Sequence, residues 1–229
     1  LFDFDTYRRL TENPRRYRYS ATTMAGLGAV PWISRRATIG DPTKKMTASL
    51  SGTVGFINDK LTHGAKLSAA IRHARAEHYT EPDFRDDLNG KDVARKLVIL
   101  AREAGYEVGM EDVDISTFLP KKYFDIKDPE ECLAAIEADL DAEMQARYME
   151  ACVRGKTLKY LATFQANSGK PKLSIALEEV SLSGAFGQLG GTDNRIEVTT
   201  NFYNEGGLYK LEGPGAGVRI TASIVRDDL

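Results

Sequence analysis

The feature that most constrains the fold is a change of hydrophobic period at Gly155. Residues 130–154 are rich in Ala, Glu, Met and Leu, a composition that predicts one long helix. Beyond Gly155, apolar residues recur at every second position, which is typical of strands. The expected strands are residues 158–164, 173–177, 196–202 and 208–211. Residues 169–171 and 204–207 are rich in Gly, Pro and Asn and predict turns between them.

Helical patterns dominate the residues before this run. A strong helix is expected from Asn89 to Gly105, because its apolar residues share one side, and Asn89 is the expected cap. Ser68 is the expected cap of a helix at residues 67–78. A polar helix and turn are expected at residues 5–17, ending near residues 13–14. Other helices are expected at residues 24–37, 51–61 and 218–225, and short strands at 17–22 and 46–50. Helices combined with hairpin-linked strands indicate an α+β fold, a mixed or antiparallel sheet covered by helices.

The composition is that of a globular protein and excludes several function classes. The 229 residues are 42% hydrophobic and 28% charged, enough for one large domain or one domain and a fragment. The net charge is -2 and the densest charge cluster is acidic or mixed, so the basic face of a nucleic-acid-binding protein is lacking. No apolar run is long enough to span a bilayer.

The cysteines and the first residues bear on the compartment. Cys132 and Cys152 both fall in the expected long helix, which predicts two free thiols and a reducing compartment. The three histidines show no metal-ligand spacing. The N-terminus lacks the basic and apolar regions of a signal peptide and has no initiator Met, so we expect a piece of a longer protein.

Residues 79–96 combine five carboxylates and four cations in a loop and the helix after it. Apolar residues are interleaved with the acids, which predicts a loop held against the body of the protein: Tyr79, Pro82, Phe84 and Leu88. A calcium loop needs an Asp-x-Asp-x-Asp-Gly ladder that this segment lacks, and magnesium would need a phosphate-binding loop. The ammonium group of a free amino acid, with three donors, suits converging carboxylates better.

Asp92 and Lys96 lie four residues apart on the expected helix and therefore point to one face. Spacing alone favours a surface ion pair worth about 0.3–0.5 kcal/mol. The functional alternative is a lysine that handles the proton of a substrate hydroxyl. Asp86 and Asp87 also have a structural reading, because acids ahead of a helix interact well with its positive end.

The wording of this segment closely resembles the substrate-binding segment of homoserine dehydrogenases, Tyr-Thr-Glu-Pro-Asp-Pro-x-Asp-Asp-Leu-x-Gly-x-Asp-Val-Ala-Arg-Lys. The similarity continues, in order, over nearly the whole chain. Matching pieces are Ala-Gly-Leu at residues 25–27, Ser-Gly-Thr at 51–53, Gly-Thr-Asp-Asn at 191–194 and Gly-Pro-Gly-Ala-Gly at 213–217. The closest resemblance is to the dehydrogenase half of bifunctional aspartokinase–homoserine dehydrogenases.

The resemblance implies NAD(P)-dependent interconversion of L-homoserine and L-aspartate 4-semialdehyde, in threonine and methionine biosynthesis. Carried over by residue, the groups that hold homoserine are Glu81, Asp87 and Asp92, the first two near its ammonium group. Asp92 and Lys96 would be the catalytic pair, with Lys96 transferring the proton. The pocket would also be lined by Gly52, Thr53 and Tyr79, and the cofactor would lie beside Gly215 and His78.

Four positions depart from the family pattern. Ser20 stands where the family has a metal-binding Glu, in a segment whose main-chain carbonyls would bind a monovalent cation at Thr23, Ala25 and Leu27. The family has Gly at the positions of Met24 and His78, and Pro at that of Gly28. These changes weaken the expectation of a cation site and place a side chain near the expected nicotinamide.

The family binds its dinucleotide on an N-terminal Rossmann domain, whose Gly-x-Gly-x-x-Gly turn is absent here in the right context. We therefore expect residues 1–22 to connect from that domain, 23–212 to form a substrate-binding and dimerisation domain, and 213–229 to return toward the nucleotide. We expect a homodimer through the sheet of residues 158–211, because hairpin strands with apolar residues on both faces need a second cover. The resemblance implies as further partner an aspartokinase fused to the parent protein, and as location the cytoplasm or, in a plant, the plastid. A non-catalytic dehydrogenase-like binding module is the alternative. Another two-domain reductase is a third, against which the Tyr-Thr-Glu-Pro-Asp wording argues.

Overall fold

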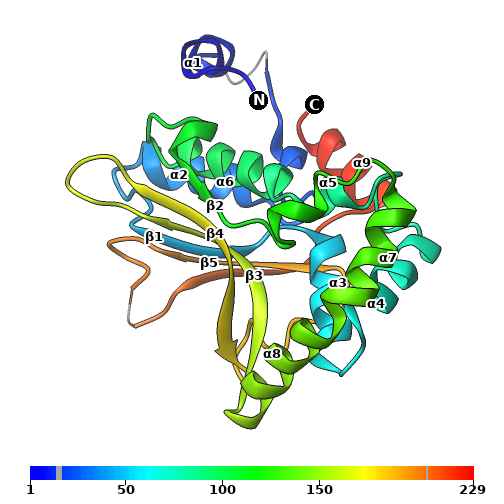
Figure 1. Ribbon diagram of the computed structural model, residues 1–229. Coiled ribbons are helices and arrows are strands. Elements are labelled where there is room, and N and C mark those ends of the chain that lie inside the picture. The colour runs from blue at the N-terminus through cyan, green and yellow to red at the C-terminus, as the bar shows by residue number, and fades with distance from the viewer. Residues whose placement is uncertain (14–16, 205) are drawn as a thin grey trace.

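A computed structural model describes residues 1–13, 17–204 and 206–229. Its described strands form one sheet in the order β2-β4-β3-β1-β5-β6 (Figure 1). The strands are β1 Lys45–Ser49, β2 Val113–Ile115, β3 Lys156–Gln165, β4 Lys172–Ser181, β5 Asp193–Thr199 and β6 Tyr209–Pro214. The β2–β4 pair is parallel and the other neighbours are antiparallel, so the expected mixed sheet of an α+β fold is confirmed.

Helices cover this sheet in two groups (Figure 1). In chain order they are α1 Phe4–Thr11, α2 Ala29–Thr38, α3 Gly52–Thr62, α4 Leu67–Ala76, α5 Arg85–Leu88, α6 Lys91–Glu103, α7 Pro129–Asp139, α8 Asp141–Val153 and α9 Val218–Asp227. The described residues also form three 3₁₀ turns, η1 Ser20–Thr22, η2 Met110–Asp112 and η3 Lys121–Tyr123. Helices α2 and α6 pack together over the sheet, while α3, α4, α7 and α8 cluster where β3 and β4 bend.

The central strand β1 positions the candidate site. It pairs with β3 on one side and β5 on the other, and Ala48 lies opposite both Ala162 and Ile196. These three residues are fully buried and join the helices in one core. Because β1 ends at Ser49 and α3 begins at Gly52, the turn between them opens at the edge of this core.

The second face of the sheet is more polar than we expected. Side chains point to alternate faces along a strand, so the residues between the core positions face the other way. They include half-buried Thr47, Thr163 and Ser174, and the hydroxyls of Thr163 and Ser174 are 2.7 Å apart. The expectation of apolar residues on both faces is therefore wrong for this part of the sheet.

The expected long helix at residues 130–154 is two helices, which break at Leu140. The break places the buried Asp141 carboxylate where it accepts hydrogen bonds from Ser68, from the amide at 2.8 Å and from the hydroxyl at 2.6 Å. Ser68 is consequently not a helix cap: Lys66 occupies the cap position of α4 without a side-chain hydrogen bond, and Ser68 lies inside the helix. A long-range bond, which helical periodicity does not encode, decides where the helix breaks.

Other boundaries differ from the sequence prediction for local reasons. Residues 17–22 contain the turn η1 in place of a strand, and α2 starts at Ala29, not Met24, after Gly28 in the left-handed region at φ 64°. Strand β5 ends before residue 202 because Thr200 instead donates to the buried Asp41 carboxylate at 2.7 Å. The three-residue strand β2 was not predicted. The expected helix and turn at residues 5–17 include residues 14–16, and the expected turn at 204–207 includes residue 205; these four residues lie outside the described residues.

Helix α6 largely follows its prediction. It spans Lys91–Glu103, and Gly105 follows in the left-handed region at φ 95°. The Asn89 side chain accepts a hydrogen bond from the Lys91 amide at 2.8 Å, so it caps the helix although Gly90 occupies the cap position. The two cysteines are free thiols, as expected. Among the described residues, no helix is both long and apolar enough to cross a bilayer.

Two of the residues that depart from the family pattern, Met24 and His78, have a left-handed backbone. Met24 and His78 are the non-glycine residues of the described chain with positive φ, at 54° and 59°. The left-handed region costs an L-residue roughly 1–2 kcal/mol, and glycine largely escapes this cost. His78 ends α4 in a Schellman arrangement, since Tyr79 donates from its amide to the Ala74 carbonyl at 2.9 Å. The glycine that the family has at both positions thus has a conformational reason.

We predict that His78→Gly stabilises the protein by about 0.5–1 kcal/mol, the left-handed cost less the entropy of a new glycine. The side chain is exposed and few contacts are lost. Met24→Gly should instead destabilise by on the order of 2 kcal/mol or more, because Met24 is buried and its removal leaves a cavity. Urea unfolding of both variants measures the difference, and a destabilised His78→Gly would contradict the strain argument.

Candidate functional site

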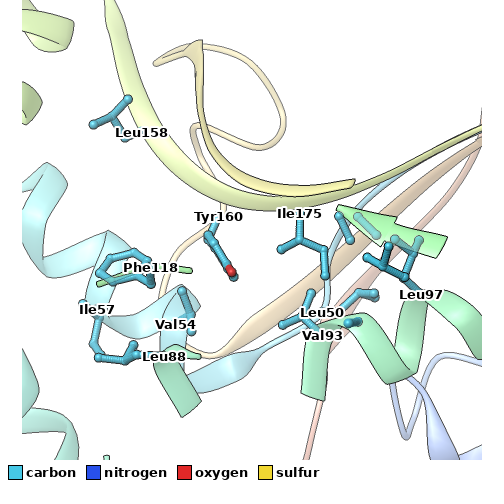
Figure 2. Packing of buried hydrophobic residues seen from close by; sticks show 14 of the residues in the cluster. Leu50, Val54, Ile57, Leu88, Val93, Leu97, Phe118, Leu158, Tyr160 and Ile175 are labelled. Atoms are coloured by element: carbon cyan, nitrogen blue, oxygen red, sulfur yellow. The ribbon is translucent and has the colours of Figure 1, made fainter. Parts of the chain in front are cut away.

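The acidic segment is held against the body of the protein by two of its apolar residues. Phe84 and Leu88 are 1% and 0% exposed. Helix α5 packs on α3, and Figure 2 shows Leu88 pointing toward Val54 and Ile57. Tyr79 is 41% exposed, so it does not anchor the loop as expected. Because Phe84 and Leu88 are anchored in the core, the neighbouring acids Asp83, Asp86 and Asp87 lie between the core and solvent.

One acid of the segment has a structural role. The Asp83 carboxylate accepts from the Arg85 side chain at 2.8 Å and from its amide at 3.0 Å. The Arg85 guanidinium also donates to the carbonyls of Ile126 and Lys127, the latter at 3.1 Å. The hydrogen bonds and charge of Arg85 hold the pKa of Asp83 below its usual range. Asp83 is therefore neutralised within the fold and ties the loop to residues 126–127.

Lys96 joins α6 to the end of β1. Its ammonium lies 2.9 Å from the Asp92 carboxylate and donates to the Leu50 carbonyl at 2.9 Å. The Lys96 side chain is 22% exposed, against 53% for Asp92, so the lysine is more enclosed than a surface ion pair requires. Since an ammonium has three donors, these two contacts fix its position next to the turn that begins α3.

Asp87 and Glu81 form the acidic wall of the site. The Asp87 carboxylate accepts from the Glu81 amide at 2.9 Å. Burial raises the pKa of Asp87, and the charges of Glu81 and Asp92 raise it further, against the lowering by hydrogen bonds from Glu81 and Thr53. Three carboxylates close enough to affect one another create a negative potential that suits a cationic guest.

The turn at residues 51–53 meets this wall directly. The Ser51 side chain caps α3 by accepting from the Val54 amide at 3.3 Å. The Thr53 hydroxyl donates to the Tyr79 carbonyl, and the Tyr79 ring packs on Phe56 with centroids 5.1 Å apart. A Cβ atom on Gly52 would lie 3.1 Å from the Thr192 carbonyl oxygen, so a larger residue would crowd that segment.

The structure connects the residues expected to bind substrate into one continuous arrangement. Its members are Gly52, Thr53, Tyr79, Glu81, Asp87, Asp92 and Lys96. Sequence reasoning missed the Leu50 carbonyl, because main-chain acceptors leave no mark in a sequence. His78 is exposed beside Tyr79.

Gly215 directly follows β6, whose last residue, Pro214, pairs with Asp193 at the start of β5. A Cβ atom there would fall 2.0 Å from the side-chain Nδ2 of Asn194, so only glycine fits. Thr192 contacts Gly52 and Asn194 contacts Gly215, so residues 192–194 link the α3 turn to the return segment. Helix α9 follows Gly217 without a side-chain cap, and uncapped amides at a helix start suit an anionic group.

The expected cation segment, residues 20–27, has a different acid from the one expected. Ser20 donates from its amide and hydroxyl to the Asp228 carboxylate, at 2.9 and 2.7 Å. The carboxylate at this place thus comes from the end of α9. The Thr23 hydroxyl is buried and has no hydrogen-bond partner among the described residues. Across residues 1–13, 17–204 and 206–229, no three His, Cys, Asp or Glu residues gather into a metal site.

Comparison with known proteins identifies the family. The family model described as homoserine dehydrogenase matches residues 31–229. The chain belongs to the homoserine dehydrogenase family. It is 36% identical over 227 residues to the bifunctional aspartokinase/homoserine dehydrogenase of Haemophilus influenzae, covering 97% of this chain and 27% of that protein.

This chain covers larger shares of two further relatives. The homoserine dehydrogenase of Saccharomyces cerevisiae is 31% identical over 216 residues, covering 92% of this chain and 59% of that protein. The crystal structure of a homoserine dehydrogenase from Thiobacillus denitrificans shares the fold with a TM-score of 0.75, at 20% identity, over 92% of this chain and 43% of that one. The chain therefore spans between about a quarter and three fifths of these family members.

Asp87→Asn is expected to raise the thermal midpoint at neutral pH, because it removes a charge from the acidic wall. The pKa of Asp87 is higher in the folded protein than its ordinary value of 3.8. The protonated carboxyl therefore contributes stability below pH 3.8, and this contribution is lost as the pH rises through the raised pKa. The gain from Asp87→Asn should therefore shrink as the pH falls toward 3.8. Thermal unfolding monitored by circular dichroism between acid and neutral pH measures it.

Asp83→Asn is the matched control, and its sign is opposite. Arg85 lowers the pKa of Asp83, so the stability from this carboxylate is present above 3.8 and lost as the pH falls through the lowered value. The control variant should be destabilised at neutral pH. If the thermal midpoints of Asp87→Asn and Asp83→Asn changed in the same direction with pH, the distinction between a structural Asp83 and an Asp87 free to bind a cation would be wrong.

Proposed function

We propose that this domain binds L-homoserine and, together with a dinucleotide-binding part, interconverts it with L-aspartate 4-semialdehyde in threonine and methionine biosynthesis. The observation that carries the proposal is the fixed Lys96 ammonium, 2.9 Å from both Asp92 and the Leu50 carbonyl, beside the acids of residues 81–87. An amino acid with a side-chain hydroxyl offers a cation for the acids and a proton for the lysine. Both requirements are met within one arrangement.

The roles of the residues follow from their chemistry. Burial raises the pKa of Asp87, and repulsion from Glu81 and Asp92 raises it further. Glu81 and Asp87 receive the substrate ammonium, whose charge offsets that repulsion. Asp92 holds Lys96 and faces the substrate. When the aldehyde is reduced, the Lys96 ammonium donates its proton to the carbonyl oxygen, and in the reverse direction the neutral amine takes the hydroxyl proton.

NAD(P) would supply and accept the hydride. The parts of the chain that would lie beside it are Gly215, where Asn194 leaves no room for a side chain, and the uncapped start of α9. His78, the other residue expected to lie beside the cofactor, has an exposed side chain. A monovalent cation, if bound, would use the carbonyls of Thr23, Ala25 and Leu27, near the unpartnered Thr23 hydroxyl.

We also propose that residues 1–22 and 213–229 join the domain, residues 23–212, to a Rossmann-type dinucleotide domain. Helices α1 and α9 lie at these ends, and neither has a fully buried residue. Exposed apolar side chains there support a covering partner: Leu1, Phe2, Val218 and Val225. The proposal includes an aspartokinase fused to the parent protein, as in the Haemophilus relative, and we place the parent protein in the cytoplasm, or in a plastid if it comes from a plant.

A non-catalytic binding module is the second candidate. The departures at Ser20, Met24 and His78 favour it. However, the strained backbones of Met24 and His78 keep the left-handed conformation that glycine would adopt there. The Asp92–Lys96 pair is also in place, which is why we prefer the enzyme.

In the complete enzyme, Lys96→Met and Asp92→Asn should each lower kcat for homoserine oxidation by about 10²–10⁴-fold, the usual contribution of a positioned acid–base group. Lys91→Met is the control, since Lys91 is an exposed lysine on the same helix. Steady-state kinetics with each variant, alongside thermal unfolding, separates catalysis from stability. Near-normal turnover in Lys96→Met would refute the assigned role.

The domain is further proposed to form a homodimer through the sheet at residues 158–211. The polar second face carries short side chains such as Thr163, Ser174 and Ala176, which would let a second sheet approach closely. Light scattering at micromolar concentration should give twice the 25.3 kDa mass of the chain. Ala176→Arg should reduce the measured mass to one chain, and a monomeric unmodified protein would contradict the proposal.

A further inference from the structure

The loop between β4 and β5, residues 182–192, lies directly against one face of α3. Gly52, Gly55 and Asp59 share this face, at helical spacing. A Cβ atom on Gly55 would lie 3.3 Å from the Gly191 carbonyl oxygen, and one on Gly52 would lie 3.1 Å from that of Thr192. The loop and helix therefore meet backbone to backbone, with no side chain between them to absorb a shift.

Lys159 holds this loop from the other side. It is a residue of β3, only 4% exposed, and its ammonium donates to the Leu189 carbonyl at 2.7 Å. Burial lowers the pKa of Lys159, while the charge of Asp59 on α3 raises it. An enclosed ammonium is costly, and a methionine or leucine would fill the same space at less cost. The lysine instead fixes one main-chain carbonyl three residues before Thr192.

The neighbouring face of α3 belongs to the candidate site. Thr53 donates to the Tyr79 carbonyl, and Phe56 packs on the Tyr79 ring. Helix α3 is thus located between the loop on its glycine face and the Tyr79 segment on the next face. A displacement of the loop would move the first turn of α3, and with it Gly52 and Thr53.

We propose that Lys159 is a positioning residue that holds residues 189–192 under the glycine face of α3 and so sets how deeply the turn at residues 51–53 enters the substrate site. The inference rests on the proposed function, because it names the substrate site whose shape Lys159 controls. Lys159 does not touch the substrate, and its effect passes through the loop backbone. The amino-acid substrate, rather than the dinucleotide, should respond to its loss.

The first test compares Lys159→Met, Lys159→Arg and Lys156→Met in the complete enzyme. Lys156 is the matched control, a lysine of the same strand that is half-exposed and paired with Glu179 at 3.1 Å. Lys159→Met should raise KM for homoserine by on the order of tenfold, as expected from a small misplacement of a binding turn. The KM for the dinucleotide should not change, Lys159→Arg should recover most of the loss, and Lys156→Met should match the wild type.

A second variant keeps the test independent of the stability of Lys159→Met. Gly55→Ala raises the helix propensity of α3 but pushes the Gly191 carbonyl from the opposite side. It should raise KM for homoserine like Lys159→Met, in a folded protein. If both variants keep KM within about twofold of the wild type, a size that one weak contact can account for, the inference is wrong.

Amide hydrogen exchange separates this inference from the proposed function. If the wild-type enzyme does not oxidise homoserine, the proposed function fails, but residues 189–192 and the start of α3 should still exchange faster in Lys159→Met than in Lys156→Met. Equal exchange in the two variants would overturn the positioning role whatever the enzyme does.

Discussion

The contact on which the candidate site depends is the Lys96 ammonium between Asp92 and the Leu50 carbonyl. It connects the first turns of α6 to the end of the central strand, immediately before α3 begins. These elements are far apart in sequence, and the shared core around Leu50, Val93 and Leu97 brings them together (Figure 2). The lysine is therefore fixed by the fold before any ligand arrives, which is the condition for effective proton transfer.

The acids around this lysine divide into two groups by their partners. Asp83 is neutralised by Arg85, which also binds two main-chain carbonyls, so its charge is spent on holding the loop. Glu81, Asp87 and Asp92 remain near one another, and the raised pKa of Asp87 reflects their mutual repulsion and burial. Clustered carboxylates repel one another, and a cationic group would relieve this repulsion, which links the stability of the loop to the proposed substrate binding.

Close backbone approach is the second constraint on the site. Gly52 and Gly55 let a loop backbone rest on α3, and Gly215 lets the return segment rest on Asn194. The same physical demand appears at His78, where a side chain occupies a left-handed backbone that ends α4 and directs Tyr79 toward Thr53. The site is thus shaped as much by main-chain positions as by the charged side chains that first draw attention.

The sequence by itself determined the alternating strands, the amphipathic helix α6 and the ordered motifs of the homoserine dehydrogenase family, because each depends on residues close together in the chain. Only the tertiary structure decided which acids are available, where α7 gives way to α8, and that β2 joins the sheet. The same holds for the buried Lys159 and for the main-chain acceptors of Lys96 and Lys159. These features arise from pairings between distant residues, and neither periodicity nor residue type records which distant partner a polar group will find when it is buried.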